Sequence, residues 1–338
     1  MLTLASALVV LTAATVAGPV VQSSGADDVE YAALIRQYSR GDFQRAMVAF
    51  AKWPAERVRR VVRTPRNVQG PDLQQTKAAA MLHADVSMLV AVTDDRLSRQ
   101  HADLARRLVL SLSDEAIRFK ERWQAYALGP TLVQHDLHLA TLVVRQGIGT
   151  YPRNADLQAM GGTILELSAR GLTADIRGVW MPNRRIEDAL QAAALAYRRA
   201  IELDPSLLSA RLRLGWTLSL NNSAGNAREQ LRVVAERASS GDQGYLAHLL
   251  LGGIAEQEGH TEAAYAEYEQ AHTMRRDAQS AHLALMRVAK ITGRVDRADS
   301  LAAEYAARAP VSEDPWWSFS MGLDGELSAW LHEQATRP

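Results

Sequence analysis

The chain has 338 residues with 38 basic and 38 acidic side chains, and it contains no cysteine. The balanced charge gives no overall attraction to nucleic acid or anionic membranes. The absence of cysteine excludes disulfides, thiolate zinc sites, iron–sulfur clusters and thiol nucleophiles. Alanine and leucine, with 56 and 42 residues, are strong helix formers, so the composition predicts an all-α fold.

The N-terminus has the pattern of a targeting segment. Residues 1–26 carry no charged side chain and begin with a long apolar stretch. Small residues at Thr15 and Ala17 are typical of a secretory signal peptide cleaved after Ala17, and a second cleavage site precedes Asp27. The protein is then exported, periplasmic or secreted. Residues 2–21 are also about long enough for an uncleaved membrane anchor, and a plain apolar terminus is the third alternative.

Residues 27–112 are expected to form an irregular helical region with one helix hairpin, which turns at Gly41. Apolar residues at helical spacing predict two further helices, at about 73–92 and 96–110. The stretch Thr93–Asp95 between them is suited to capping the second helix.

A basic run interrupts this region between the hairpin and the next helix. Its members are Arg57, Arg59, Arg60, Arg63 and Arg66. The favoured interpretation is a solvated face, or internal pairing with Asp and Glu. Contact with an acidic protein or with lipid head groups is the alternative. Nucleic acid is least favoured, because no aromatic residues are interleaved for base stacking.

A repeated helix pair follows, and its clearest copy surrounds Tyr197. Ala193, Tyr197 and Ala200 are spaced by four and three residues, which places them on one helix face. Pro205 ends that helix. The next helix contains Gly215, whose small size lets a neighbouring helix approach closely.

Further copies recur at a regular interval. The turn glycines Gly259 and Gly293 are 34 residues apart, and repeat-like pairs extend over residues 113–311. Weaker copies occupy residues 28–54 and 113–152. The pattern of a small residue, a turn glycine, Ala with an aromatic residue and a final Pro resembles the tetratricopeptide repeat (TPR) family. The resemblance implies a right-handed α-solenoid of helix hairpins with a concave groove.

The resemblance also implies that residues of the first helix in each pair line this groove, where a peptide or protein partner binds. At these places the chain carries Gln158, Leu165, Leu212, Trp216, Leu249, Glu256, Leu283, Arg287 and Lys290. Leucines occupy the places where some family members carry a carboxylate clamp, so a clamp of that kind is not expected. The alternative is that these leucines only pack against neighbouring repeats.

Two segments depart from the repeat. An insertion at about residues 170–185 contains glycine and proline and is expected to be a loop. At the C-terminus, residues 312–338 carry Trp316 and Trp317 ahead of a short helix. They are expected to form a cap over the last repeat, because solenoids need their final apolar face covered. A partner-binding aromatic patch is the alternative.

Motifs of catalysis are missing from the sequence. It has no phosphate-binding loop, no H-E-x-x-H and no G-x-S-x-G. His135 and His138 could share a metal with His83 and His101, but local hydrogen bonding explains nine scattered histidines better. No metal and no cofactor are expected. The sequence thus favours a non-catalytic protein-binding scaffold over a structural or assembly subunit, and places an enzyme using the His135–His138 pair and the insertion last.

Overall fold

The computed structural model of the chain describes residues 25–61, 68–70, 72–113, 116–133, 136–170, 183–238, 240–307, 314–323 and 325–337. Over these ranges the protein is all-helical, with one isolated backbone bridge between Val68 and Leu112 and no strand. Arg63, Arg66, His135, nearly all of the predicted targeting segment and most of the insertion lie outside the described residues. None of the described helices is long and apolar enough to cross a membrane.

The N-terminal half contains helices of unequal length. They are α1 (Gly25–Ser39), α2 (Phe43–Phe50), α3 (Ala55–Val61), α4 (Asp72–Val90), α5 (Asp95–Leu110), α6 (Ile117–Tyr126), α7 (Leu128–Val133) and α8 (Leu137–Thr150). The two helices predicted at 73–92 and 96–110 are confirmed as α4 and α5. Asp94 caps α5, as its spacing predicts, because its carboxylate accepts the Leu97 N–H at 2.9 Å.

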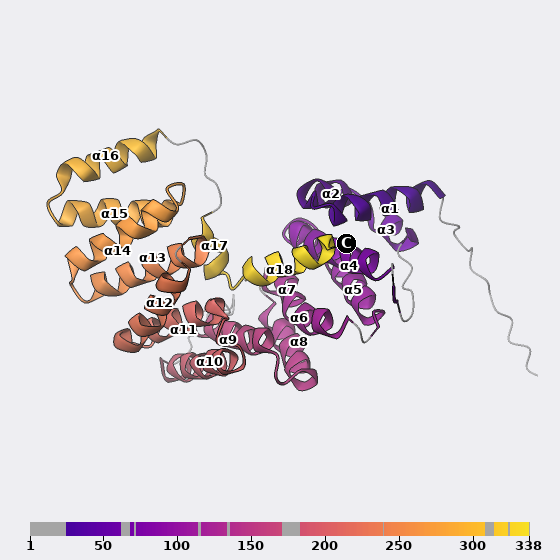
Figure 1. Cartoon of the computed structure of the whole chain (residues 1–338), viewed down its shortest axis with the longest axis horizontal. Coiled ribbons are helices and arrows are strands. Elements are labelled where there is room, and N and C mark those ends of the chain that lie inside the picture. Colours follow the sequence, from indigo (N-terminus) through magenta and orange to yellow (C-terminus); the bar gives the residue numbers. More distant parts are fainter. Residues whose placement is uncertain are drawn as a thin grey trace, which may run out of the picture.

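The second half is built from helices joined mostly by short turns. They are α9 (Ala155–Ala169), α10 (Asn183–Leu203), α11 (Leu208–Leu220), α12 (Ala224–Arg237), α13 (Asp242–Gln257), α14 (Thr261–Met274), α15 (Gln279–Ile291) and α16 (Val295–Ala306). Each of these helices packs against the next one along the chain (Figure 1). The turns of the last two hairpins contain Gly259 and Gly293 at φ of +79° and +75°, a conformation that favours glycine.

The helix faces predicted from spacing are buried in the structure. Ala193, Tyr197 and Ala200 have no exposed surface. The close approach expected at Gly215 is also confirmed, since a Cβ built there would lie 2.6 Å from the Leu231 side chain. In the last hairpin the expected helix face is only partly buried, because Ala302 on α16 is exposed.

The apolar interior of the described residues is divided among three clusters along the array of helices. One cluster extends from α1 to α9 without a break at residue 112, and the next extends from α9 to α15. A small third cluster joins the last hairpins through Tyr268, Leu285 and Leu301.

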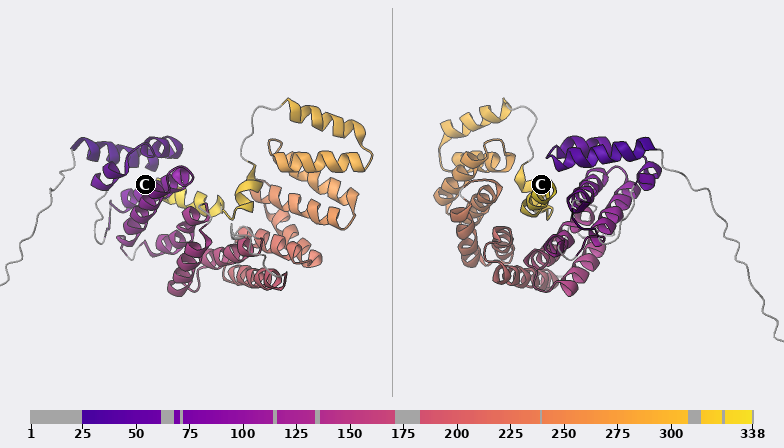
Figure 2. Two further views of the ribbon diagram at one scale, coloured as in Figure 1. Left: turned by 180° about the vertical axis from the view of Figure 1, so that it is seen from behind. Right: turned by 45° about the vertical axis from the view of Figure 1, so that its right-hand side comes forward.

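Residues 314–337, here called the C-terminal segment, return to the interior of the array. They form the short helix α17 (Pro315–Ser320) and the helix α18 (Gly325–Thr336). The array of helices curves around this segment (Figure 2). Helix α18 packs mainly against α4 and α6. Although α18 follows α16 closely in the sequence, the two helices lie apart in space. The expectation of a terminal cap over the last repeat is therefore wrong, because the apolar face of α18 finds its partner in the N-terminal half.

Candidate functional site

The inner face, meaning the surface of α4, α6, α9, α11 and α13 that contacts the C-terminal segment, is the candidate functional site. The first residue of the C-terminal segment that contacts the helix array is Asp314, which is buried with 1% exposed. The Asp314 carboxylate accepts hydrogen bonds from the Tyr245 hydroxyl at 2.9 Å and from the Ser280 N–H at 2.6 Å. It also accepts the Trp316 N–H at 3.0 Å and so caps α17. One buried carboxylate thus fixes the start of α17 to α13 and α15.

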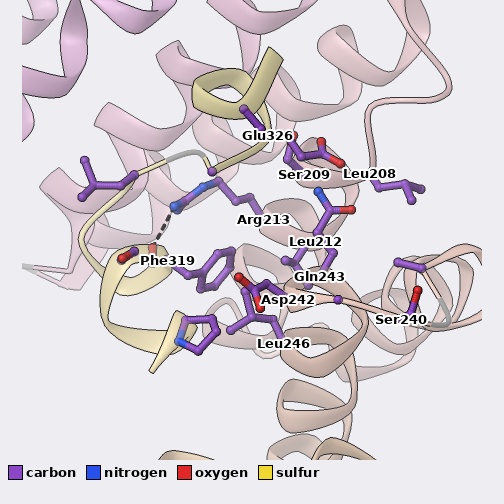
Figure 3. Close-up of a pocket in the computed structure, with 17 residues that line it drawn as sticks. Leu208, Ser209, Leu212, Arg213, Ser240, Asp242, Gln243, Leu246, Phe319 and Glu326 are labelled. Atoms are coloured by element: carbon purple, nitrogen blue, oxygen red, sulfur yellow. Dashed lines mark hydrogen bonds between the residues drawn. The ribbon is translucent and has the colours of Figure 1, made fainter. Parts of the chain in front are cut away.

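Two arginines of the inner face hold the other end of α17. Arg213 donates to the Phe319 carbonyl and Arg170 donates to the Ser320 carbonyl, both at 2.7 Å. These carbonyls belong to the last turn of α17, where backbone carbonyls carry partial negative charge, and the Phe319 carbonyl also accepts the Gly322 N–H at 3.0 Å. Figure 3 shows Arg213 reaching from α11 to the C-terminal segment. The two cations therefore bind the backbone at the end of α17, and the Arg213 guanidinium also lies 4.5 Å from the centroid of the Phe319 ring.

A buried carboxylate keeps these arginines in place. Glu166 on α9 has no exposed surface and lies 3.4 Å from Arg213 and 3.5 Å from Arg170. The Tyr197 hydroxyl donates to Glu166 at 2.9 Å. Burial first, and then the charge of Glu166, raises the pKa of Tyr197 well above its ordinary value. Two guanidinium groups around one carboxylate leave a net positive charge facing α17.

Aromatic packing adds an apolar contact beside the arginines. The Trp216 ring lies 5.2 Å from the Trp316 ring and 4.9 Å from the Phe319 ring, centroid to centroid. The Arg170 guanidinium lies 4.1 Å from the Trp216 centroid. By contrast, the Trp317 side chain points away and is 54% exposed. Neighbouring tryptophans of α17 therefore have different environments.

Helix α18 is anchored by a second buried carboxylate. Asp85 on α4 is 2% exposed and accepts a hydrogen bond from Tyr38 at 2.5 Å and another from Tyr126. His332 of α18 lies 2.7 Å from Asp85, and its ring lies 4.4 Å from that of Phe43. The apolar side of α18 buries Leu327, Leu331 and Ala335. This end of the C-terminal segment is thus part of the N-terminal core.

A cavity of about 680 Å³ remains between the inner face and the C-terminal segment (Figure 3). Its apolar wall includes Leu208, Leu212, Leu246 and Phe319, and its polar groups include Arg213 and Glu326. A volume of this size is within the usual range of ligand pockets.

The predicted groove residues have different environments in the structure. Leu212 and Trp216 are buried beside the C-terminal segment, and Leu165 and Leu249 are partly buried in the cores. The polar members mostly contact this chain: Gln158 donates to the Pro152 carbonyl and Arg287 donates to Glu256 at 2.8 Å. Leu283 is half-buried and Lys290 is exposed. That these residues bind a partner stays a prediction.

The described part of the basic run is paired within the chain. Arg57 contacts Asp27 at 2.9 Å and Glu30 at 2.5 Å, and its guanidinium lies 3.6 Å from the Trp53 centroid. Arg60 also contacts Asp27, and Arg59 contacts Glu56. These contacts agree with the interpretation that the run pairs internally.

The histidines considered as an alternative metal site do not all meet in the structure. His83 and His101 meet in the N-terminal core, with their Nδ1 atoms 2.8 Å apart. His138 is exposed at the start of α8, where Asp136 caps the helix. A shared site for these three residues is therefore wrong, because two of the rings are buried and the third faces solvent.

The sequence interpretation missed Glu166, Arg170, Arg213, Asp85 and His332. Three of them gave a usable signal, because each is a charged residue flanked by apolar residues within a helix: Asp85 in HADVS, Glu166 in ILELS and Arg213 in LRLG. A charge on a predicted buried face indicates a buried partner.

No family model matches the chain, and no curated protein matches it.

Proposed function

We propose that this chain is a non-catalytic binding scaffold: a right-handed solenoid of TPR-like helix hairpins, exported to the cell envelope or beyond, whose inner face binds a short helix of a partner protein. The 34-residue spacing of turn glycines and the packing of consecutive helices support the solenoid. The observation that carries the binding role is the inner face itself. Arg170 and Arg213 hold the backbone end of a short helix that the chain supplies itself.

The chemistry of α17 defines the class of partner. The partner segment has an acidic N-cap like Asp314 and aromatic residues like Trp316 and Phe319. The carbonyls of its last helical turn accept hydrogen bonds from the two arginines. Such a partner competes with the C-terminal segment for the same contacts. Because the C-terminal segment belongs to the same chain, its effective concentration at the inner face is high, on the order of millimolar. A partner in trans therefore binds more tightly when the C-terminal segment is weakened.

The test uses full-length protein and a fluorescent peptide with the sequence of residues 314–337. Fluorescence anisotropy gives the apparent Kd. Phe319→Ala in the full-length chain weakens the tethered segment and is expected to lower the Kd for the unchanged peptide by at least about tenfold. Trp317→Ala is the matched control, because that ring is exposed, and it is expected to leave the Kd unchanged.

A third variant separates inner-face binding from non-specific association. Adding Arg213→Met to the Phe319→Ala chain removes the donor to the helix end and is expected to reverse the gain in affinity. Circular dichroism checks that both variants keep their helices. Absence of peptide binding to the Phe319→Ala chain, or equal binding with and without Arg213, refutes the proposed function.

End-to-end assembly as a structural subunit is the second interpretation from sequence, and light scattering of the full chain over a range of concentrations tests it.

A further inference from the structure

Three side chains with metal-binding atoms meet near the free end of the helix array. They are His272 on α14, His282 on α15 and Glu304 on α16, and one donor atom from each lies within 4.8 Å of the others. The two imidazole rings are perpendicular, with centroids 5.0 Å apart. Spacings of 10 and 22 residues match no metal motif, so only the fold brings them together.

The hydrogen bond of His282 prepares its ring for coordination. Its Nε2 lies 2.7 Å from the Leu301 carbonyl oxygen, which can only accept, so Nε2 carries the proton. The neutral ring then has its lone pair on Nδ1. A backbone carbonyl bound to the far nitrogen is the usual support of a metal-ligating histidine. His282 is fully buried, and the Tyr305 ring packs on it at 5.5 Å.

The carboxylate of Glu304 is also oriented. Its Oε1 accepts from Ser300 at 3.1 Å and lies 3.5 Å from Arg297. Its Oε2 lies 4.0 Å from Nε2 of His272. Donors of one tetrahedral zinc ion lie about 3.4 Å apart, given bonds of roughly 2.0–2.2 Å, so a small movement of this side chain closes the site.

An ion at this location would stabilise the packing of the last hairpin. Helix α16 buries only Ala298 and Leu301, and the C-terminal segment leaves it uncovered. Terminal repeats require special stabilisation, and a chain without cysteine cannot use a disulfide. An ion bound to α14, α15 and α16 together holds the last hairpin in place.

We propose that His272, His282 and Glu304 bind one zinc ion that fastens α16 to the array. Two imidazoles and a carboxylate form a donor set that zinc favours, and water completes the coordination. Glu304 has 48% of its side chain exposed, which provides the entry path. This site is independent of the inner face and of the proposed partner.

The test is a competition titration of chelator-treated full-length protein with zinc in the presence of a chromophoric chelator. One ion per chain is expected for the wild type. Glu304→Gln, on a half-exposed side chain, and His282→Gln are each expected to weaken binding at least about tenfold. His248→Gln is the matched control, because His248 also contacts a glutamate, Glu267 at 2.7 Å, without a second histidine in the site. It is expected to bind zinc as the wild type does.

Two further readouts separate the site from adventitious binding. Cobalt(II) in place of zinc is expected to give the visible absorption of a four-coordinate ion. Hydrogen exchange in α16 is expected to slow about 100-fold at free zinc 100 times the Kd, since opening of the helix releases the ion. No stoichiometric zinc binding by the wild type, or binding unchanged in both Glu304→Gln and His282→Gln, overturns the proposal.

Discussion

His83 and His101 form a buried pair whose protonation should destabilise the fold in mild acid. Both rings are fully buried, with Phe50 against each of them and the Tyr31 hydroxyl 3.0 Å from Nε2 of His83. Within the described part of the chain, Nε2 of His101 has no hydrogen-bond partner. Burial lowers the pKa of His101 from 6.5 to about 4, and burial together with the charge of His101 lowers the pKa of His83 well below its ordinary value.

The sign and size follow from these values. A histidine whose pKa is lower in the folded state is protonated first in the unfolded state, so its stabilisation is complete above pH 6.5 and is lost towards pH 4. For His101 alone, the free energy of unfolding is expected to fall by about 2 kcal/mol between pH 7.5 and pH 5. His83 acts in the same direction, so the observed loss is at least this large.

Urea denaturation followed by circular dichroism at several pH values between 7.5 and 5 measures this slope. The double variant His83→Gln/His101→Gln retains polar side chains that do not titrate, and it should lose most of the slope. His138→Gln, on an exposed residue of α8, should retain it. A slope that is the same in the double variant and in the wild type would refute the assignment to this pair.

Four other substitutions have outcomes that follow from the structure. Gly215→Ala places a Cβ 2.6 Å from Leu231 and should lower the free energy of unfolding by about 1–3 kcal/mol. Gly225→Ala is the control, because its Cβ meets no atom within 4 Å, and it should leave the free energy of unfolding unchanged or raise it by up to about 1 kcal/mol. Urea denaturation measures both. Asp94→Ala removes the cap of α5 and should lower the free energy of unfolding by about 1 kcal/mol in the same assay. An unchanged urea midpoint would contradict this. Arg213→Met should speed proteolytic cleavage within the C-terminal segment, and an unchanged cleavage rate would show that the arginine does not hold α17.

Local features of the fold could be predicted from the sequence because their causes are local. Ala193, Tyr197 and Ala200 share a face through helical geometry alone, and the turns at Gly259 and Gly293 need only a residue that tolerates positive φ. These features lie within one helix pair, so the spacing of a few residues was enough to find them.

The site could not be predicted in the same way, because its contacts join distant parts of the chain. Asp85 and His332 are separated by 247 residues, and Arg213 and Phe319 by 106. The sequence shows that α18 has an apolar face but not which surface covers it. A cap over the last repeat and the observed packing of α18 against the N-terminal half would bury the same leucines. Hydrophobic patterning therefore cannot distinguish these two positions of α18.

The return of α18 to the N-terminal half also changes how the protein must fold. An open array of repeats can fold progressively, since each unit contacts only its neighbours. Here Leu327 and Leu331 complete a core shared with α1, α4 and α6, so the packing of these early helices is finished by a helix that is made much later. During synthesis at roughly 5–20 residues per second, the early helices wait many seconds with that surface uncovered. The core around α1, α4 and α6 therefore cannot be completed before α18 has been made.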